Sequence, residues 1–366
     1  MSLDALPIMD ARSPGPDEAP TMTEPMYDEA FLMRLEGGLR AALPRWGLSG
    51  GTQLKLLTIS ENATFRAHDP AAGRDLVFRV HRPGYHSRAE IESELAWLTA
   101  LGRDGVVPTL TPVPQTDGAL IADIDDDGRT RHVVAFNLLP GREPAEGEDL
   151  PRWYRELGAI NARLHAHAKR WQRPDGFVRK RWDYEAMLGE VQLWGDWRAG
   201  LGLDAEGRAV LERTADVLRR LIEDYGTDES RFGLVHADMR VANLLVDGDR
   251  LSVIDFDDCG FSWFLYDFAA SVSFSEHEPY IPELQAAWIE GYRTVAPLSD
   301  EDCAILPVFI MLRRMLLTAW IASHSETPTA LALGEAYTSG TVDLARIFLA
   351  TYDADGADIV PGSTAS

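Results

Sequence analysis

The chain has 366 residues, of which 45% are hydrophobic, and it carries a formal net charge of -23. This length and hydrophobic content suffice for two lobes or domains with sizeable cores. An acidic excess of this size argues against nucleic acid as the main partner, because phosphate backbones are bound by basic patches. The excess permits a cationic substrate, although solubility is the simpler explanation.

Cysteine content and apolar segments indicate the compartment. Two cysteines, Cys259 and Cys303, do not form a disulfide framework in a chain of this length, which favours a reducing environment. The first residues lack the basic and apolar regions of a signal peptide. The most apolar stretch, residues 305–323, is interrupted by Arg313 and Arg314, which indicates a buried helix and not a membrane span. We therefore expect a cytoplasmic protein without a membrane partner.

The first part of the chain predicts a polar tail followed by a small mixed lobe. Residues 1–25 are rich in Pro, Asp, Glu and Ser and are expected to be a disordered tail. An amphipathic helix is predicted over 27–43, where leucines recur at helical spacing. Residues 52–80 predict three strands separated by turns. We place this N-terminal lobe at residues 26–137.

A helix and further strands complete this lobe. Residues 87–101 predict a helix with Ser87 as its N-cap. Three more strands are predicted, over residues 106–113, 119–123 and 131–139. The Pro-Gly pair at 140–141 marks a break after them, as expected at a hinge between lobes.

Helical patterns dominate the rest of the chain. We expect a mostly helical C-terminal lobe over residues 138–352 and a flexible tail at 353–366. Its helices are predicted over residues 150–170, 204–225, 262–273, 280–295, 299–323 and 327–350. Tryptophans crowd the region up to residue 200; most are assigned to the core, and a minority are candidates to hold a cationic amine by cation–π contact.

The segment 234–258 carries the strongest chemical signal. It places His236, Asp238 and Asn243 in the spacing H-x-D-x-x-x-x-N, and Asp255 follows in Ile-Asp-Phe. An Asp-Gly-Asp turn between apolar residues predicts a hairpin that folds Asp255 back beside Asn243. Phosphoryl transfer to a hydroxyl requires a carboxylate that orients the hydroxyl and accepts its proton, and oxygen ligands for Mg²⁺. The sequence therefore predicts Asp238 as the base and Asn243 and Asp255 as metal ligands.

For either motif alone, a loop whose Asp and Asn residues only cap turns is the alternative; both motifs in this order make that interpretation the weaker one. Together they resemble the aminoglycoside phosphotransferase and choline kinase family, which has the protein-kinase-like fold and is similar to bacterial stress-response kinases. The family reads H-G-D-x-x-x-x-N, then I-D-W or I-D-F with a further acid. This chain has Ala237 in place of the glycine, which is strained if the loop requires a positive φ. Asp267, in Tyr-Asp-Phe-Ala, is similar to the family's D-L-A aspartate, which braces the catalytic loop.

The resemblance covers roughly residues 50–350 and implies the fold, the cofactors and the reaction. The fold implied is α+β, with a small N-terminal lobe containing an antiparallel sheet and a larger, mostly helical C-terminal lobe. The cofactors implied are ATP and Mg²⁺. The reaction implied is transfer of the γ-phosphate to a hydroxyl of a small acceptor, such as an amino alcohol or amino sugar.

Within such a fold, ATP is expected to contact the N-terminal lobe. Because no glycine lies between Thr52 and Gly73, the turn at Ser60 and Asn62 would meet the phosphates with backbone N–H groups and short side chains; an ordinary hairpin turn is the alternative. The adenine is expected at the hinge residues, which are Phe136, Asn137 and Leu138.

Arg79 stands where kinases place the lysine that binds the α- and β-phosphates. Arginine is permanently charged and forks onto phosphate, so it can serve with a different geometry. Glu94 is expected to pair with Arg79 from the following helix, and Glu90 is the second choice.

Three further residues complete the predicted site. His236 is expected to brace the loop. Arg240 is expected to stabilise the γ-phosphoryl charge, although a surface arginine is the alternative. Asp257 is expected to assist the metal or to contact the acceptor.

Two other functions stay open. A protein Ser/Thr kinase of the stress-response type is the second choice within the kinases. A catalytically weak nucleotide-binding pseudokinase is favoured by Arg79 and the missing glycine loop, and it is opposed by the intact Asp238, Asn243 and Asp255.

Overall fold

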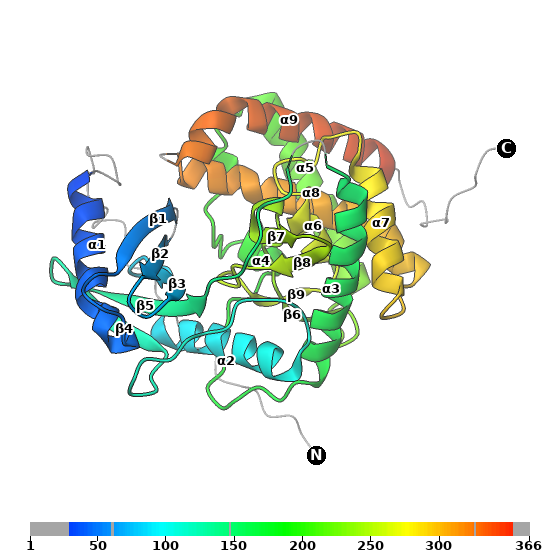
Figure 1. The fold of residues 1–366 in the computed structure, drawn as a ribbon. Helices are drawn as coiled ribbons and strands as arrows, with labels where there is room; N and C mark the ends of the chain where they lie inside the picture. Colours follow the sequence, from blue (N-terminus) through cyan, green and yellow to red (C-terminus); the bar gives the residue numbers. More distant parts are fainter. Residues whose placement is uncertain (1–28, 60–61, 146–147, 326, 354–366) are drawn as a thin grey trace, which may run out of the picture.

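The computed structural model describes residues 29–59, 62–145, 148–325 and 327–353. Ser60, the predicted tail over 1–25 and all but the first residue of the tail predicted over 353–366 lie outside these ranges. The described chain forms two lobes, a smaller one built on a sheet and a larger one built mostly of helices (Figure 1).

The N-terminal lobe contains an antiparallel five-stranded sheet in the order β1-β2-β3-β5-β4 (Figure 1). Along β2, buried side chains alternate with more exposed ones, as expected for a strand with one face on a core. The helix α1 (Glu29–Ala42) contributes Leu35 and Leu39 to the core on this face, and a short 3-10 turn, Leu43–Trp46, follows it. The strands are β1 (Gln53–Ile59), β2 (Ala63–Asp69), β3 (Arg74–Val80), β4 (Ile121–Asp126) and β5 (Arg129–Asn137).

The helix α2 (Arg88–Asp104) begins where the sequence predicts it. Ser87 and Glu90 form a capping box, in which each side chain accepts a hydrogen bond from the backbone of the other. Glu90 is thereby used at the helix end. Leu95 and Leu98 are buried on the inner face, and this orientation carries Glu94 into the interior as well.

Residues 106–113 form no strand, contrary to the prediction. They make isolated bridges, one of which joins Thr109 to Val253 of the C-terminal lobe. Pro108 and Pro112 lack the N–H group that a strand donates to its neighbour, so an apolar pattern here does not produce a ladder.

Seven α-helices of the described chain build the larger lobe. Gly158 and Gly291 lie where α3 and α7 cross, and a Cβ built on Gly291 would come 1.7 Å from a backbone oxygen of α3. Only glycine therefore permits this close contact. The helices are α3 (Leu150–Arg170), α4 (Tyr184–Met187), α5 (Ala205–Tyr225), α6 (Tyr266–Ser271), α7 (Ile281–Arg293), α8 (Asp300–Ser323) and α9 (Pro328–Tyr352).

Two short strand pairs hold the catalytic segment. The predicted hairpin is confirmed: β7 (Leu244–Asp247) pairs with β8 (Arg250–Val253). The strand β6 (Phe232–Val235) pairs with β9 (Gly260–Trp263). The helix predicted over 262–273 is therefore wrong in its first part, because pairing with β6 outweighs the local helical pattern.

The helix α8 is long and apolar enough to be a candidate membrane span by length and composition, although that criterion is weak. Its most apolar window is 78% buried inside the protein. Arg313 and Arg314 are each only 2% exposed. This burial agrees with the prediction that residues 305–323 form a core helix.

Candidate active site

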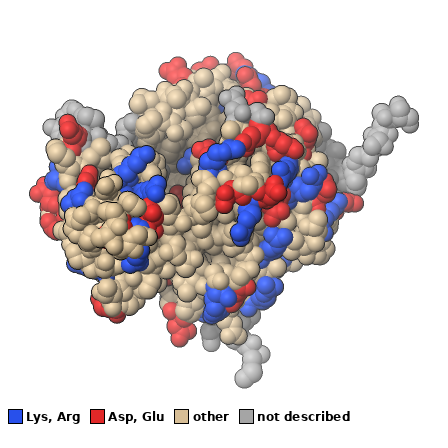
Figure 2. Space-filling model, viewed as in Figure 1, with Lys and Arg blue, Asp and Glu red and all other residues tan. Residues whose placement is uncertain are grey.

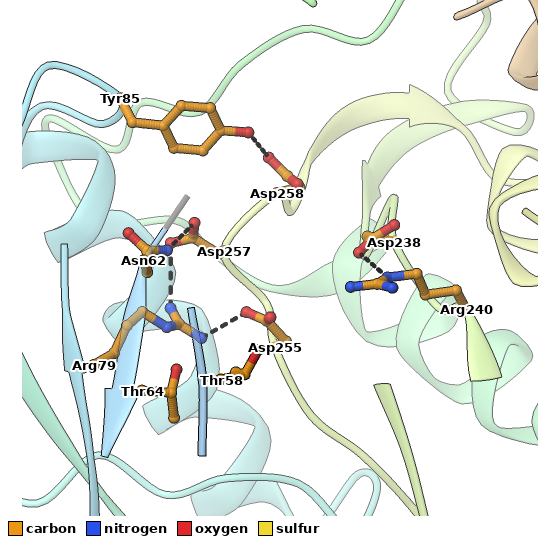
Figure 3. Close-up of a pocket in the computed structure, with 10 residues that line it drawn as sticks. All are labelled: Thr58, Asn62, Thr64, Arg79, Tyr85, Asp238, Arg240, Asp255, Asp257 and Asp258. Carbon is orange, nitrogen blue, oxygen red and sulfur yellow. Dashed lines mark hydrogen bonds and ion pairs between the residues drawn. The ribbon is translucent and has the colours of Figure 1, made fainter. Parts of the chain in front are cut away.

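A polar cavity lies between the two lobes. On the face shown in Figure 2, acidic and basic side chains are interspersed, and a crevice separates the smaller lobe from the larger one. Figure 3 shows the cavity wall, which joins residues of the catalytic segment to Arg79 and Asn62 of the N-terminal lobe. The lining residues are Thr58, Asn62, Thr64, Arg79, Tyr85, Asp238, Arg240, Asp255, Asp257 and Asp258.

Asp238 is held on a loop between β6 and the 3-10 turn Val241–Asn243. The Asn243 amide nitrogen donates to the backbone oxygen of Asp238 at 2.7 Å and to its Oδ2 at 2.9 Å. Arg240 lies 3.4 Å from the same Oδ2. Burial alone would raise the pKa of Asp238, but Arg240 and Arg313 outweigh it and hold the pKa below its usual value. Asp238 is therefore ionised at neutral pH and able to accept a hydrogen bond from a hydroxyl.

A buried aspartate supports this loop from below. Oδ1 of Asp267 accepts the backbone N–H of Ala237 at 2.8 Å, and its Oδ2 lies 2.8 Å from Nε2 of His165. Ala237 has φ of 67°, so the strain expected from the missing glycine is present. His236 is fully buried, and its ring nitrogens contact the backbone N–H of Asp238 and the backbone oxygen of Ile254. These contacts suit the bracing role expected of His236.

Asn243 and Asp255 offer oxygen ligands for a metal ion. The backbone N–H of Ile254 donates to the backbone oxygen of Asn243 at 2.9 Å, which fixes the two ends of the hairpin together. Because the Asn243 amide nitrogen is bonded to Asp238, its amide oxygen is the atom left for a metal. The described residues contain no cluster of three or more His, Cys, Asp or Glu suited to a metal. An amide oxygen and a carboxylate nevertheless fit Mg²⁺, which takes few protein ligands when phosphates supply the others.

Arg79 joins the N-terminal lobe to this acidic centre. Its Nη1 lies 2.7 Å from Oε1 of Glu94 and 3.2 Å from Oδ1 of Asp257, and its Nη2 lies 2.8 Å from Oδ1 of Asp255. Its guanidinium also lies 5.3 Å from the ring centre of Phe136. Of the two glutamates considered, Glu94 is the one that the structure places on Arg79.

Residues 55–298 match the model of the phosphotransferase enzyme family. The chain belongs to this family. The predicted resemblance and the α+β, protein-kinase-like fold are confirmed, and ATP and Mg²⁺, expected from the sequence, are the usual cofactors of this family.

Several relatives of this phosphotransferase have assigned acceptors. A structure described as a microcompartment-associated aminopropanol kinase is 43% identical, with a TM-score of 0.80, over 86% of this chain and 97% of that one. The structure of amicoumacin kinase hAmiN with AMP-PNP, Ca²⁺ and Ami is 24% identical, with a TM-score of 0.70, over 87% of this chain and 94% of that one. A homoserine kinase of Rhizobium johnstonii is 30% identical over 206 residues, which are 54% of this chain and 58% of that protein. The present phosphotransferase is therefore a kinase, and its relatives indicate a small-molecule hydroxyl as the acceptor.

Of the remaining predicted residues of this phosphotransferase, Asn62 lines the cavity, Ser60 lies outside the described residues, and the three hinge residues lie away from the cavity lining. Asn62 donates from Nδ2 to Oδ2 of Asp257 at 2.7 Å. Phe136 is buried at the end of β5, Asn137 is exposed, and Leu138 follows the strand. The three hinge residues are not among those lining the cavity, so the adenine position stays a prediction.

Sequence reasoning missed Arg313 as a site residue. From α8, its Nη2 lies 2.8 Å from Oδ1 of Asp238, and its Nη1 donates to the hydroxyl of Tyr266 at 3.0 Å. Its Nε donates to Ser273 Oγ at 3.0 Å. The available signal was an arginine inside an otherwise apolar helix, since a buried charge requires a partner.

Asp258 was also missed. Its Oδ1 accepts a hydrogen bond from the hydroxyl of Tyr85 at 3.0 Å (Figure 3). Burial raises the pKa of Asp258 to about 6. The signal was a third acid directly after Asp255 and Asp257, which the motif itself does not require.

Proposed function

We propose that this phosphotransferase transfers the γ-phosphoryl group of ATP to the hydroxyl of a small amino alcohol of the size of aminopropanol. The observation that carries the proposal is the 43% identity to the aminopropanol kinase structure over almost the whole of that chain. The cavity is compatible with such an acceptor, because four carboxylates line it and favour a cationic ligand.

Asp238 performs the central step in this proposal. Its ionised carboxylate accepts a hydrogen bond from the acceptor hydroxyl, orients the oxygen towards the phosphorus and receives the proton as the O–P bond forms. Asn243 and Arg313 fix both carboxylate oxygens of Asp238 in place. Such fixed positioning is the main catalytic contribution that a protein makes to phosphoryl transfer.

The phosphates are received by the cations of the cavity. Arg79 and Arg240 face the same space as Asp238 and carry the charges that the nucleotide requires. Asn243 and Asp255 would hold Mg²⁺, which when bound neutralises phosphate charge.

Homoserine is the second candidate acceptor, because homoserine kinases are among the relatives. Homoserine also carries a carboxylate, which requires a cation of its own. Of the two basic side chains that line the cavity, Arg240 already lies 3.4 Å from Asp238 and Arg79 contacts three carboxylates. The simple amino alcohol is therefore the better fit.

The test is ADP release with ATP and Mg²⁺, for the wild type beside Asp238→Asn. Acceptors are 1-amino-2-propanol, ethanolamine, homoserine, an aminoglycoside and a generic protein substrate. We expect turnover with the two small amino alcohols, and its loss in the variant. Turnover with homoserine alone would show that homoserine, and not a simple amino alcohol, is the acceptor. Turnover with the protein substrate alone would favour the Ser/Thr kinase.

A further inference from the structure

Asp258 differs from the other carboxylates of the cavity in forming no ion pair with a basic side chain among the described residues, although the nearby charge of Lys180 partly offsets the rise that burial causes in its pKa. Asp238 pairs with Arg313, and Asp255 and Asp257 both pair with Arg79. In the part of the chain that the structure describes, no basic side chain forms an ion pair with Asp258. A carboxylate that is partly buried and unpaired in a ligand cavity is free to bind a cation that arrives with the ligand.

The surroundings of Asp258 hold this carboxylate in a defined position. The hydroxyl of Tyr85 donates to Oδ1 and itself accepts the indole N–H of Trp194 at 3.3 Å. The indole N–H of Trp182 donates to the backbone oxygen of Asp258 at 2.8 Å. Lys180 places its ammonium over the ring of Tyr85, 3.8 Å from the ring centre. Among the described residues, Oδ2 of Asp258 accepts no hydrogen bond, so this oxygen is the one available to a ligand.

Strand pairing places this carboxylate beside the catalytic loop. Val235 of β6 pairs with Gly260 of β9. Asp238 follows β6 in the chain, and Asp258 precedes β9, so both emerge from the same end of one ladder. Both line the cavity, and in the view of Figure 3 Asp258 lies between Tyr85 and Asp238.

We propose that Asp258 binds the ammonium group of the acceptor while Asp238 binds its hydroxyl. This inference rests on the proposed amino alcohol kinase function. In a vicinal amino alcohol the nitrogen and oxygen are carried by adjacent carbons, so the two carboxylates that recognise them must line one small cavity. The ammonium donates to Oδ2 of Asp258, and the Tyr85 hydroxyl holds the other oxygen.

The other acids of the cavity are less suited to this role. Asp257 is only 6% exposed, and Arg79, Asn62 and His86 surround its carboxylate. Asp255 is expected to bind the metal. Asp258 is therefore the specificity residue that separates an amino alcohol from an uncharged alcohol of the same shape.

The experiment compares 1-amino-2-propanol with propane-1,2-diol, which replaces the ammonium by a hydroxyl. Loss of a charged hydrogen bond in Asp258→Asn should raise KM for the amino alcohol about 10- to 100-fold, with a smaller change in kcat. KM for the diol should stay the same, so discrimination between the two acceptors should collapse. Tyr85→Phe should raise KM for the amine by about 2- to 10-fold, because it removes the hydrogen bond that holds Asp258 while the carboxylate itself stays.

Asp249→Asn is the matched control, since it removes the same charge from the β7–β8 turn, where the side chain is 89% exposed. It should leave both KM values unchanged. If Asp258→Asn fails to fold, Asp258→Glu keeps the charge and should alter KM for the amine more than KM for the diol. An unchanged preference for the amine in a folded Asp258 variant would overturn the inference and leave the amino alcohol kinase intact. Failure of the wild type to use any amine would overturn both.

Discussion

Nη2 of Arg79 lies 2.8 Å from Oδ1 of Asp255. Arg79 is the cation expected to bind the phosphates, and Asp255 is an expected metal ligand, so the two residues form an ion pair with each other. If Asp255 binds the metal and Arg79 binds a phosphate, as expected, nucleotide binding would compete with this contact. Arg79 retains Glu94 as a partner when this happens, because the Glu94 contact comes from its other terminal nitrogen. The arginine in the lysine position can thus exchange one carboxylate for a phosphate without losing its anchor.

Replacement of Arg79 by methionine should lower the free energy of unfolding by about 3–5 kcal/mol, because it leaves buried acids without a cation. Glu94 is fully buried and Asp257 nearly so. Urea unfolding measures the change. Arg152→Met is the control, since Arg152 and its partner Asp249 are exposed, and its effect should be below about 1 kcal/mol. Equal losses in the two variants would show that the buried cluster does not require the cation.

Asp238→Asn should reduce turnover by about 10²- to 10⁴-fold, the range for removal of a general base, while nucleotide affinity changes little. Rapid-quench measurement of phosphoryl transfer and titration with an ATP analogue separate the two effects. Asp238→Ala is a poorer choice, because it also removes the side-chain oxygens that accept hydrogen bonds from the Asn243 amide and from Arg313. Parallel loss of turnover and nucleotide affinity in Asp238→Asn would contradict the role of Asp238 as the base.

Ala237→Gly should retain activity and keep or raise stability, by up to about 1 kcal/mol. The left-handed backbone costs about 1–2 kcal/mol for a residue with a Cβ, and the greater freedom of glycine in the unfolded chain offsets part of the gain. Thermal and urea unfolding measure the balance. Ala166→Gly, in the middle of α3, should instead lose about 1 kcal/mol. A clear destabilisation by Ala237→Gly would show that the methyl group of this buried residue contributes more than its strain costs.

Stability should fall as the pH drops below about 6.5. Burial lowers the pKa of His165 and His236 below their ordinary value, and lowers that of His81 to about 3. The folded state therefore keeps these rings neutral where the unfolded chain protonates them, so the unfolded state binds more protons and gains stability in acid. Each histidine contributes at most about 1.4 kcal/mol per pH unit.

Unfolding in urea between pH 7.5 and pH 5 tests this dependence. His81→Leu should make stability depend less on pH, because it removes a histidine that is neutral in the folded state. The substitution breaks no hydrogen bond, since the ring nitrogens of His81 have no hydrogen-bond partner among the described residues. His277→Asn, which replaces an exposed histidine, is the matched control. An unchanged slope in His81→Leu would mean that His81 binds protons equally in the folded and unfolded states, which would contradict the lowered pKa of its buried ring.

The catalytic segment was predictable because its geometry is local. The hairpin that brings Asp255 to Asn243 follows from a turn between two short apolar runs. Glu94 was likewise available from helix periodicity, since it flanks the core position Leu95.

What the sequence did not predict depends on contacts between distant segments. Arg313 reaches Asp238 across 75 positions, and Tyr85 reaches Asp258 across 173. No spacing rule connects such pairs. The error over residues 106–113 has another cause, because their apolar pattern resembles a strand while their prolines prevent one.

The crossing of α3 and α7 at Gly158 and Gly291 is connected to the catalytic loop as well as to the core. Beside this crossing, Trp288 of α7 donates to Asn161 of α3 at 2.8 Å, and Asn161 lies 3.3 Å from the Asp267 carboxylate. Asp267 in turn accepts the backbone N–H of Ala237, so a chain of hydrogen bonds joins the helix crossing to the catalytic loop. We therefore expect substitutions at Gly158 or Gly291 to alter the catalytic rate as well as the stability, although neither residue lines the cavity.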